Sequence, residues 1–232
     1  IKMVKRIHII AAHPDDELLG CGGAILHHLS KGDKVRVTIV AEGLTSRDKK
    51  RDRKKRLKGL NKLKNTTKKI FKKIGVKEID FLDLADNRLD SYNLIDVIKP
   101  IETIINSFKP NIIYTHHPGD LNIDHCIVNR AVMTASRPKP KNFIEKIYSF
   151  EILSSTNWSI NHTNSNFEPN YFLNIKKYLK KKIKLLSYYK SEIEKWPHSR
   201  SLKSVEFLAK YRGSTVGIEA AEAFCLLRQV DK

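Results

Sequence analysis

The stretch KRIHIIAAHPDDELLG, Lys5–Gly20, is the most informative about the fold, because a strand pattern runs directly into charged residues and then into a helix. Lys5–Ala12 is apolar and rich in Ile, which is typical of a strand buried on both faces of a parallel sheet. Helical spacing follows from Glu17 to Ser30, and Gly32 is a suitable C-cap. This unit predicts the first strand and the first helix of an α/β sheet.

The same alternation continues along the chain. Strands are predicted at Lys34–Ala41, Glu78–Leu82, Asn111–Thr115 and Lys146–Ile152. Helices are predicted within the basic stretch Arg47–Lys73, which stops before Gly75, and over Tyr92–Phe108 and Asp124–Ala135. Strands separated by helices of this length indicate an α/β fold, with a mostly parallel sheet and helices on both faces.

The pattern changes at Ser154. A polar segment runs to Asn170, and a long amphipathic helix is predicted over Ile175–Lys195, ended by Trp196-Pro197. Another helix begins near Leu202, and the segment Ala220–Leu227 closes the chain. No repeat or linker separates two domains. We therefore expect a single domain over residues 1–232, with an α/β core over 1–153 and a helical C-terminal extension over 154–232.

The composition is that of a soluble globular protein. Hydrophobic residues make up 41% of the 232 residues and charged residues 30%, so the chain lacks the signature of disorder. No apolar run approaches the ~18 residues of a transmembrane helix, and no signal-peptide pattern is present. Three widely spaced cysteines argue against a disulfide framework. We expect a cytoplasmic protein, with a peripheral position at the inner membrane surface left open.

Positive charge is concentrated in one segment. The net charge is +19, and Arg47–Lys73 holds 15 basic and two acidic residues. Two interpretations stay open: the segment attracts an acidic partner, or it is a solvated lysine-rich helix face like Lys176–Lys184. In either case we expect its helix to bury Leu57, Leu60, Leu63 and Ile70. A basic protein that only bound nucleic acid or a membrane surface would leave two polar clusters unexplained.

These clusters are His13-Pro14-Asp15-Asp16-Glu17, after the first strand, and His116-His117-Pro118-Gly119-Asp120-Leu121-Asn122-Ile123-Asp124-His125, after the fourth. The carboxyl ends of parallel strands meet at one edge of the sheet, so both clusters belong to one crevice. Histidine and aspartate suit Zn²⁺, and a catalytic zinc keeps three protein ligands and one water. Helix capping explains one Asp per helix but neither the histidines nor the doubled Asp. The sequence thus predicts a metal-dependent hydrolase.

Four segments carry a resemblance: AHPDDELLGCGG, LTSR, DNRLD and THHPGDLNIDH. Together they resemble the LmbE-like (PIG-L) family of zinc-dependent carbohydrate de-N-acetylases. The resemblance implies a Rossmann-like α/β fold and removal of an N-acetyl group from a 2-acetamido sugar. That sugar is a GlcNAc-type glycoside, a nucleotide sugar or a lipid-linked sugar. It also implies His13, Asp16 and His125 as zinc ligands, Asp15 as the general base that activates water, and Asp124 as a supporting residue behind the ligands.

The resemblance places substrate contacts at Arg47 in LTSR and at Asp86 and Asn87 in DNR. In the C-terminal part, PHSRS resembles segments that cover the site in some members, which makes Arg200 a further candidate contact, with a surface arginine as the alternative. One position departs from the pattern, because Asn122 stands where some members have a histidine. Asparagine donates a hydrogen bond to an oxyanion but does not shuttle a proton, so the acid role falls on Asp15.

Several expectations stay open at this point. His117 is a further candidate substrate contact. His117 and His116 either substitute for the missing histidine or line the loop, and we favour lining. The expected partner is a small-molecule or lipid-linked N-acetylated sugar, without specific nucleic-acid binding. An anionic substrate and a homo-oligomer are not decided. A metal-dependent hydrolase of another bond, such as a phosphoester, is the alternative activity, and two metals ~3.5–4 Å apart would favour it.

Overall fold

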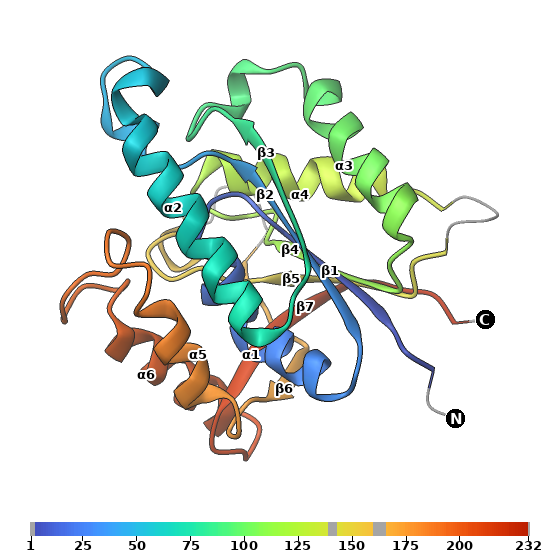
Figure 1. Cartoon of the computed structure of the whole chain (residues 1–232). Coiled ribbons are helices and arrows are strands. Elements are labelled where there is room, and N and C mark those ends of the chain that lie inside the picture. Colours follow the sequence, from blue (N-terminus) through green and yellow to red (C-terminus); the bar gives the residue numbers. More distant parts are fainter. Residues whose placement is uncertain (1–2, 139–142, 160–165, 232) are drawn as a thin grey trace.

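A seven-stranded sheet forms the centre of the computed structural model, which describes residues 3–138, 143–159 and 166–231 (Figure 1). The strands lie in the order β3-β2-β1-β4-β5-β7-β6, and the first five are parallel. The strand bounds are β1 Arg6–Ala11, β2 Lys34–Ala41, β3 Glu78–Leu84, β4 Ile112–His116, β5 Lys146–Phe150, β6 Tyr171–Asn174 and β7 Ala221–Gln229. The predicted mostly parallel α/β fold is confirmed.

Helices cover both faces of this sheet. The helix bounds are α1 Asp16–Ser30, α2 Arg53–Ile74, α3 Leu94–Phe108, α4 Ile123–Ala135, α5 Leu179–Leu186 and α6 Leu202–Ser214. Side chains alternate along a strand, so β1 sends Ile7 and Ile9 to the face under α1, α2, α5 and α6, and Ile10 to the face under α3 and α4. Both faces of β1 are therefore buried, as its unbroken apolar run predicts.

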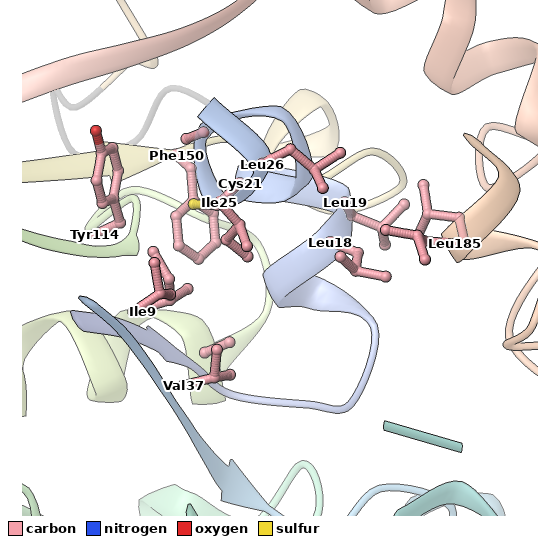
Figure 2. Close-up of a cluster of buried hydrophobic side chains, with 14 of the residues drawn as sticks. Ile9, Leu18, Leu19, Cys21, Ile25, Leu26, Val37, Tyr114, Phe150 and Leu185 are labelled. Atoms are coloured by element: carbon pink, nitrogen blue, oxygen red, sulfur yellow. The ribbon is translucent and has the colours of Figure 1, made fainter. Parts of the chain in front are cut away.

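Helix α1 seats closely on the sheet, which fixes where its first turn lies. Figure 2 shows Leu18, Cys21 and Ile25 of α1 among the buried side chains, near Ile9 and Phe150 of the sheet. A Cβ atom on Gly20 would lie 2.3 Å from Cδ2 of Phe150, so only glycine allows this approach. Gly20 thus serves helix–strand packing, whereas Gly22 allows Lys182 of α5 to approach on another side of the helix.

The order in which strands are added to the sheet reverses between β1 and β4. From β1 it adds β2 and β3 on one side, and then returns to add β4 and β5 on the other side. The connections that leave β1 and β4 diverge at this point and leave a crevice at the carboxyl ends of the strands. Both polar clusters of the sequence follow these two strands.

The C-terminal extension is only partly helical, which corrects the expectation for residues 154–232. β7 runs antiparallel to β5 and covers the edge of that strand, and β6 pairs with β7 in turn. The predicted helix Ile175–Lys195 is shortened to Leu179–Leu186 because Tyr189 leaves the helical path to bury its ring beside α1 and α2. Residues 160–165 of the predicted polar segment lie outside the described residues. Because both segments share one sheet, this pairing supports the single domain that we propose.

Helix α2 differs from expectation at one position. Leu60, Leu63 and Ile70 are buried as predicted, but Leu57 is 51% exposed. The N-terminal end of α2 projects past the sheet, so it has no apolar surface beneath it there (Figure 1). In the part of the chain that the structure describes, no helix is long and apolar enough to cross a bilayer.

Candidate metal centre and active site

The two polar clusters meet in a pocket of about 360 Å³ at the carboxyl ends of β1 and β4. The first cluster forms the turn between β1 and α1, and the second forms the loop between β4 and α4. The Thr45–Arg47 turn after β2 and the loop after β3 add further walls. A further wall comes from the C-terminal extension, through Glu192 and Arg200.

Three side chains bring their ligand-type atoms together at the floor of this pocket. Asp16 Oδ2 lies 3.2 Å from His13 Nδ1 and 3.2 Å from His125 Nε2. The two ring nitrogens are 3.4 Å apart. Ligand atoms about 2.0–2.2 Å from a tetrahedral zinc lie roughly 3.3–3.5 Å from one another. The two nitrogens and one carboxylate oxygen therefore fit a tetrahedral metal that keeps its fourth position open.

The other nitrogen of each histidine faces a buried carboxylate. His13 Nε2 lies 3.0 Å from Asp124 Oδ2, and His125 Nδ1 lies 3.2 Å from Asp120 Oδ1. Burial by itself would lower the pKa of His13 and of His125, but the surrounding carboxylates, Asp16 among them, raise both above the ordinary value. Such carboxylates fix the ring orientation and leave the opposite nitrogen free to bind a metal.

Asp120 is a residue that sequence reasoning did not single out. Its carboxylate accepts hydrogen bonds from the Asn122 backbone N–H and from the Ser155 and Thr156 hydroxyls. Burial would raise its pKa, but these bonds and His125 hold it at about 2. Asp120 therefore stays ionised at neutral pH. Its place in the second cluster, five residues before His125, was the only sequence signal for this role. The Ser155 and Thr156 hydroxyls that complete its hydrogen bonds come from a loop more than 30 residues away.

Asp15 lines the same pocket and precedes Asp16 directly in the chain. Its backbone φ is 112°, in the left-handed region that residues other than glycine rarely adopt. Backbone strain of this kind is concentrated at functional sites. Oδ1 is buried without a hydrogen-bond partner, while Oδ2 accepts from Arg200. Burial raises the pKa of Asp15 well above its usual range although Arg200 acts in the opposite direction. The group combines a free oxygen with a raised pKa.

The strained turn at Asp15 is held by Glu17, whose part the sequence did not reveal. The Asp15 N–H donates to Glu17 Oε2 at 2.9 Å, and the hydroxyl of Tyr189 donates to Glu17 Oε1 at 2.7 Å. Burial raises the pKa of Glu17 to about 7. The C-terminal extension thus supports the turn from behind, through a tyrosine for which the sequence offered no signal.

The candidate substrate contacts surround the same pocket. Asp86 Oδ1 lies 3.3 Å from His13 Nε2, and Asp86 Oδ2 accepts from the Ser46 N–H. The Asn122 side chain caps α4 by accepting from the Asp124 N–H and donates to the side-chain oxygen of Asn87. The structure also brings Arg47 and Arg200 to the pocket wall.

His117 does not reach the pocket, so its expected substrate contact is not supported by its position. The side chain is buried and its ring meets Phe167 edge-on, with centroids 5.3 Å apart. His116 stacks on His125 at a centroid distance of 3.8 Å and accepts from the Ala12 N–H. Burial holds the pKa of His116 well below the ordinary value. A neutral ring packed behind a candidate ligand agrees with the lining role that we favoured.

The basic helix α2 forms one rim of the crevice through Leu63. Its helical residues include 11 basic and no acidic side chains. Lys55 and Arg56 pair with Asp48, and Lys64 pairs with Asp83. Lys54, Lys58, Lys62, Lys69 and Lys72 are exposed to solvent.

The sequence of this chain matches that of known proteins. Residues 8–136 match the family PIG-L, described as GlcNAc-PI de-N-acetylase. A relative from Escherichia coli strain K12, the uncharacterized deacetylase YaiS, is 30% identical over 142 residues, which cover 59% of this chain and 71% of YaiS. The segment over residues 8–136 that matches the family contains both polar clusters.

Solved structures share the fold. The N,N'-diacetylchitobiose deacetylase from Pyrococcus horikoshii has a TM-score of 0.77 and 18% identity, over 96% of this chain and 84% of its own. The 4-carboxy-2-hydroxymuconate hydratase from Pseudomonas putida has a TM-score of 0.74 and 18% identity, over 99% and 98%. Because a hydratase and a deacetylase share this fold, the site residues have to decide the reaction. The match over residues 8–136, which is more than half of the sequence, shows that this chain belongs to the PIG-L family.

Proposed function

We propose that the chain is a zinc-dependent hydrolase that removes the acetyl group from a 2-acetamido sugar. The observation that carries this proposal is the triangle of His13, Asp16 and His125 ligand atoms, 3.2–3.4 Å apart, beside the unpartnered oxygen of Asp15. Membership of a de-N-acetylase family and the deacetylase relative support the carbohydrate N-deacetylase activity.

His13, Asp16 and His125 would hold the metal, and Asp124 and Asp120 would keep the two rings in place. A bound zinc ion supplies a Lewis acid for the amide carbonyl and lowers the pKa of water to about 7. A second group of carboxylates, Asp86 and Asp124, also gathers around His13. The two groups use opposite nitrogens of this histidine, Nδ1 toward Asp16 and Nε2 toward Asp86 and Asp124. A neutral imidazole binds a metal through one nitrogen while the other carries the proton, so the described residues support one metal rather than the pair typical of many phosphoesterases.

Asp15 is the group that moves the proton. Its unpartnered Oδ1 takes a proton from the attacking water, and the protonated carboxyl then donates it to the sugar nitrogen as the C–N bond breaks. Acetate and an amino sugar leave. A raised pKa suits this task because the group must both accept and return a proton near neutral pH.

Asn122 takes a binding role rather than a proton-transfer role. One N–H of its side-chain amide donates to Asn87, and the second N–H is available to the oxygen of the scissile amide. Asp86, Asn87, Arg47 and Arg200 would contact the sugar. Residues other than these four determine whether the sugar is free, nucleotide-linked or lipid-linked. Assembly into a homo-oligomer likewise depends on surfaces outside this pocket.

The test is an acetate-release assay on a panel of N-acetylated sugars and nucleotide sugars. We expect the zinc-loaded protein to release acetate from at least one member, and His125→Ala to lose both bound zinc and activity, because three ligands leave no redundancy. Elemental analysis gives the zinc content. Full zinc occupancy in His125→Ala would contradict the ligand set, and acetate release from none of the sugars would contradict the activity.

A further inference from the structure

The two arginines that the structure places in the pocket wall are both already paired. Arg47 Nη2 donates to Glu192 Oε2 at 2.8 Å, and Arg200 donates to Asp15. Among the described residues that line the pocket there is no lysine. The pocket therefore differs from the outer face of α2, where several lysines are exposed.

Glu192 is the partner that cancels the charge of Arg47. It lies in the C-terminal extension, six residues after α5 ends, and its side chain is only 11% exposed. Tyr189 holds this segment against the core, because its buried hydroxyl bonds to Glu17 and Thr67. Glu192 is thus fixed by the fold rather than free to swing into solvent.

One oxygen of this carboxylate has no partner in the protein. Glu192 Oε1 is buried in the pocket wall without a hydrogen bond, while Oε2 pairs with Arg47. A buried carboxylate oxygen accepts hydrogen bonds only, and leaving it unpaired is costly. Nε of Arg200 is also buried without a partner. The wall therefore offers one unpaired acceptor and one unpaired donor, and a sugar hydroxyl is able to pair with either kind of group.

We propose that Glu192 is a specificity-determining residue that makes the pocket select neutral, hydroxyl-bearing sugars over their phosphorylated forms. This inference rests on the proposed function and adds the substrate class. A hydroxyl donates to Glu192 Oε1, whereas a phosphate at the same place meets a carboxylate and finds Arg47 already neutralised. The exposed lysines of α2 do not line the pocket in which the choice is made.

The experiment compares kcat/KM for acetate release from N-acetylglucosamine and from its 1- and 6-phosphates. The wild type prefers the neutral sugar. Glu192→Gln keeps the size of the side chain but frees the charge of Arg47, so the preference shifts toward at least one phosphate, on the order of tenfold. The matched control is Glu194→Gln, because Glu194 is exposed two residues away, and it leaves the ratio unchanged.

A reciprocal variant guards against a folding defect in Glu192→Gln. Arg47→Gln leaves the carboxylate unopposed, so it shifts the ratio further against the phosphates. Zinc content and Tm show whether each variant is folded. If the enzyme releases acetate but neither variant moves the ratio, the role of Glu192 is wrong while the proposed function stands. If the wild type releases acetate from no sugar, the proposed function fails and the substrate class fails with it.

Discussion

Asp120→Asn tests how the protein prepares His125 for a metal. Asp120 Oδ1 lies 3.2 Å from His125 Nδ1, which keeps a proton on that nitrogen and leaves Nε2 free. Asparagine has nearly the same shape but no charge, and its amide can turn to donate to Nδ1. That arrangement would place the proton on Nε2, the atom that faces His13 and Asp16.

The expected loss follows from this position behind a ligand. Removing a carboxylate that orients a metal-binding histidine costs about 10–100-fold in metal affinity, or ~1.4–2.7 kcal/mol. The assay is competition between the metal-free protein and a chromophoric zinc chelator, with the Tm of the metal-free protein measured in parallel. The Tm separates a change at the ligand from a loss of the fold, since Asp120 also accepts from two hydroxyls.

The chain offers a matched control in a second buried His–Asp pair. Asp33 Oδ2 lies 2.7 Å from His28 Nδ1 at the other end of α1, and neither residue lines the pocket. Asp33→Asn removes the same charge from the same kind of contact, so it leaves zinc affinity unchanged. Zinc affinity of Asp120→Asn within twofold of the wild type, or an equal loss in both variants, would show that Asp120 does not prepare His125 for the metal.

Three further predictions address the base, the core and pH. Asp15→Asn retains zinc but lowers kcat by ~10²–10⁴-fold, and near-normal acetate release would place the base elsewhere. Burial lowers the pKa of His8 to about 3, so between pH ~6.5 and pH 3 the unfolded chain binds a proton at His8 that the folded chain does not. The free energy of unfolding therefore falls as the pH is lowered through this range, by at most ~1.4 kcal/mol per pH unit. Urea unfolding against pH shows a smaller slope in His8→Gln, and equal slopes would contradict this. Gly20→Ala places a Cβ 2.3 Å from Phe150 and lowers the free energy of unfolding by ~1–3 kcal/mol, which is measured as a lower Tm. Gly59→Ala is the control, because its Cβ meets only the flexible end of Leu44. Equal Tm values for the two variants would contradict the close packing of Gly20.

The core of the fold and the floor of the site were predictable because both depend on local sequence. The buried strand at Arg6–Ala11 and the polar residues behind it fix the edge of the sheet where the site lies. Asp15 and Asp16 follow that strand directly, so strand order alone brings them to His125.

The rest of the site depends on contacts between distant segments. Glu192 and Tyr189 lie in a segment that the sequence assigned to a helix, and tertiary contacts with α1 and α2 override that helical pattern. β7 was not predicted as a strand, because a short apolar run does not separate a strand from a buried helix. His117 stands in the motif but turns away from the pocket, which no spacing rule predicts.

Metal dependence of the deacetylase activity is measured by zinc titration of the metal-free protein, followed by acetate release from the best N-acetylated sugar of the panel. We expect no acetate without metal and a rise in rate that stops at one zinc per chain, since the two described ligand groups share His13 and a neutral imidazole binds one metal. In Asp16→Asn the rise should require far more zinc. Acetate release that survives complete removal of the metal, or a rate that keeps rising to two zinc ions per chain, would contradict the account.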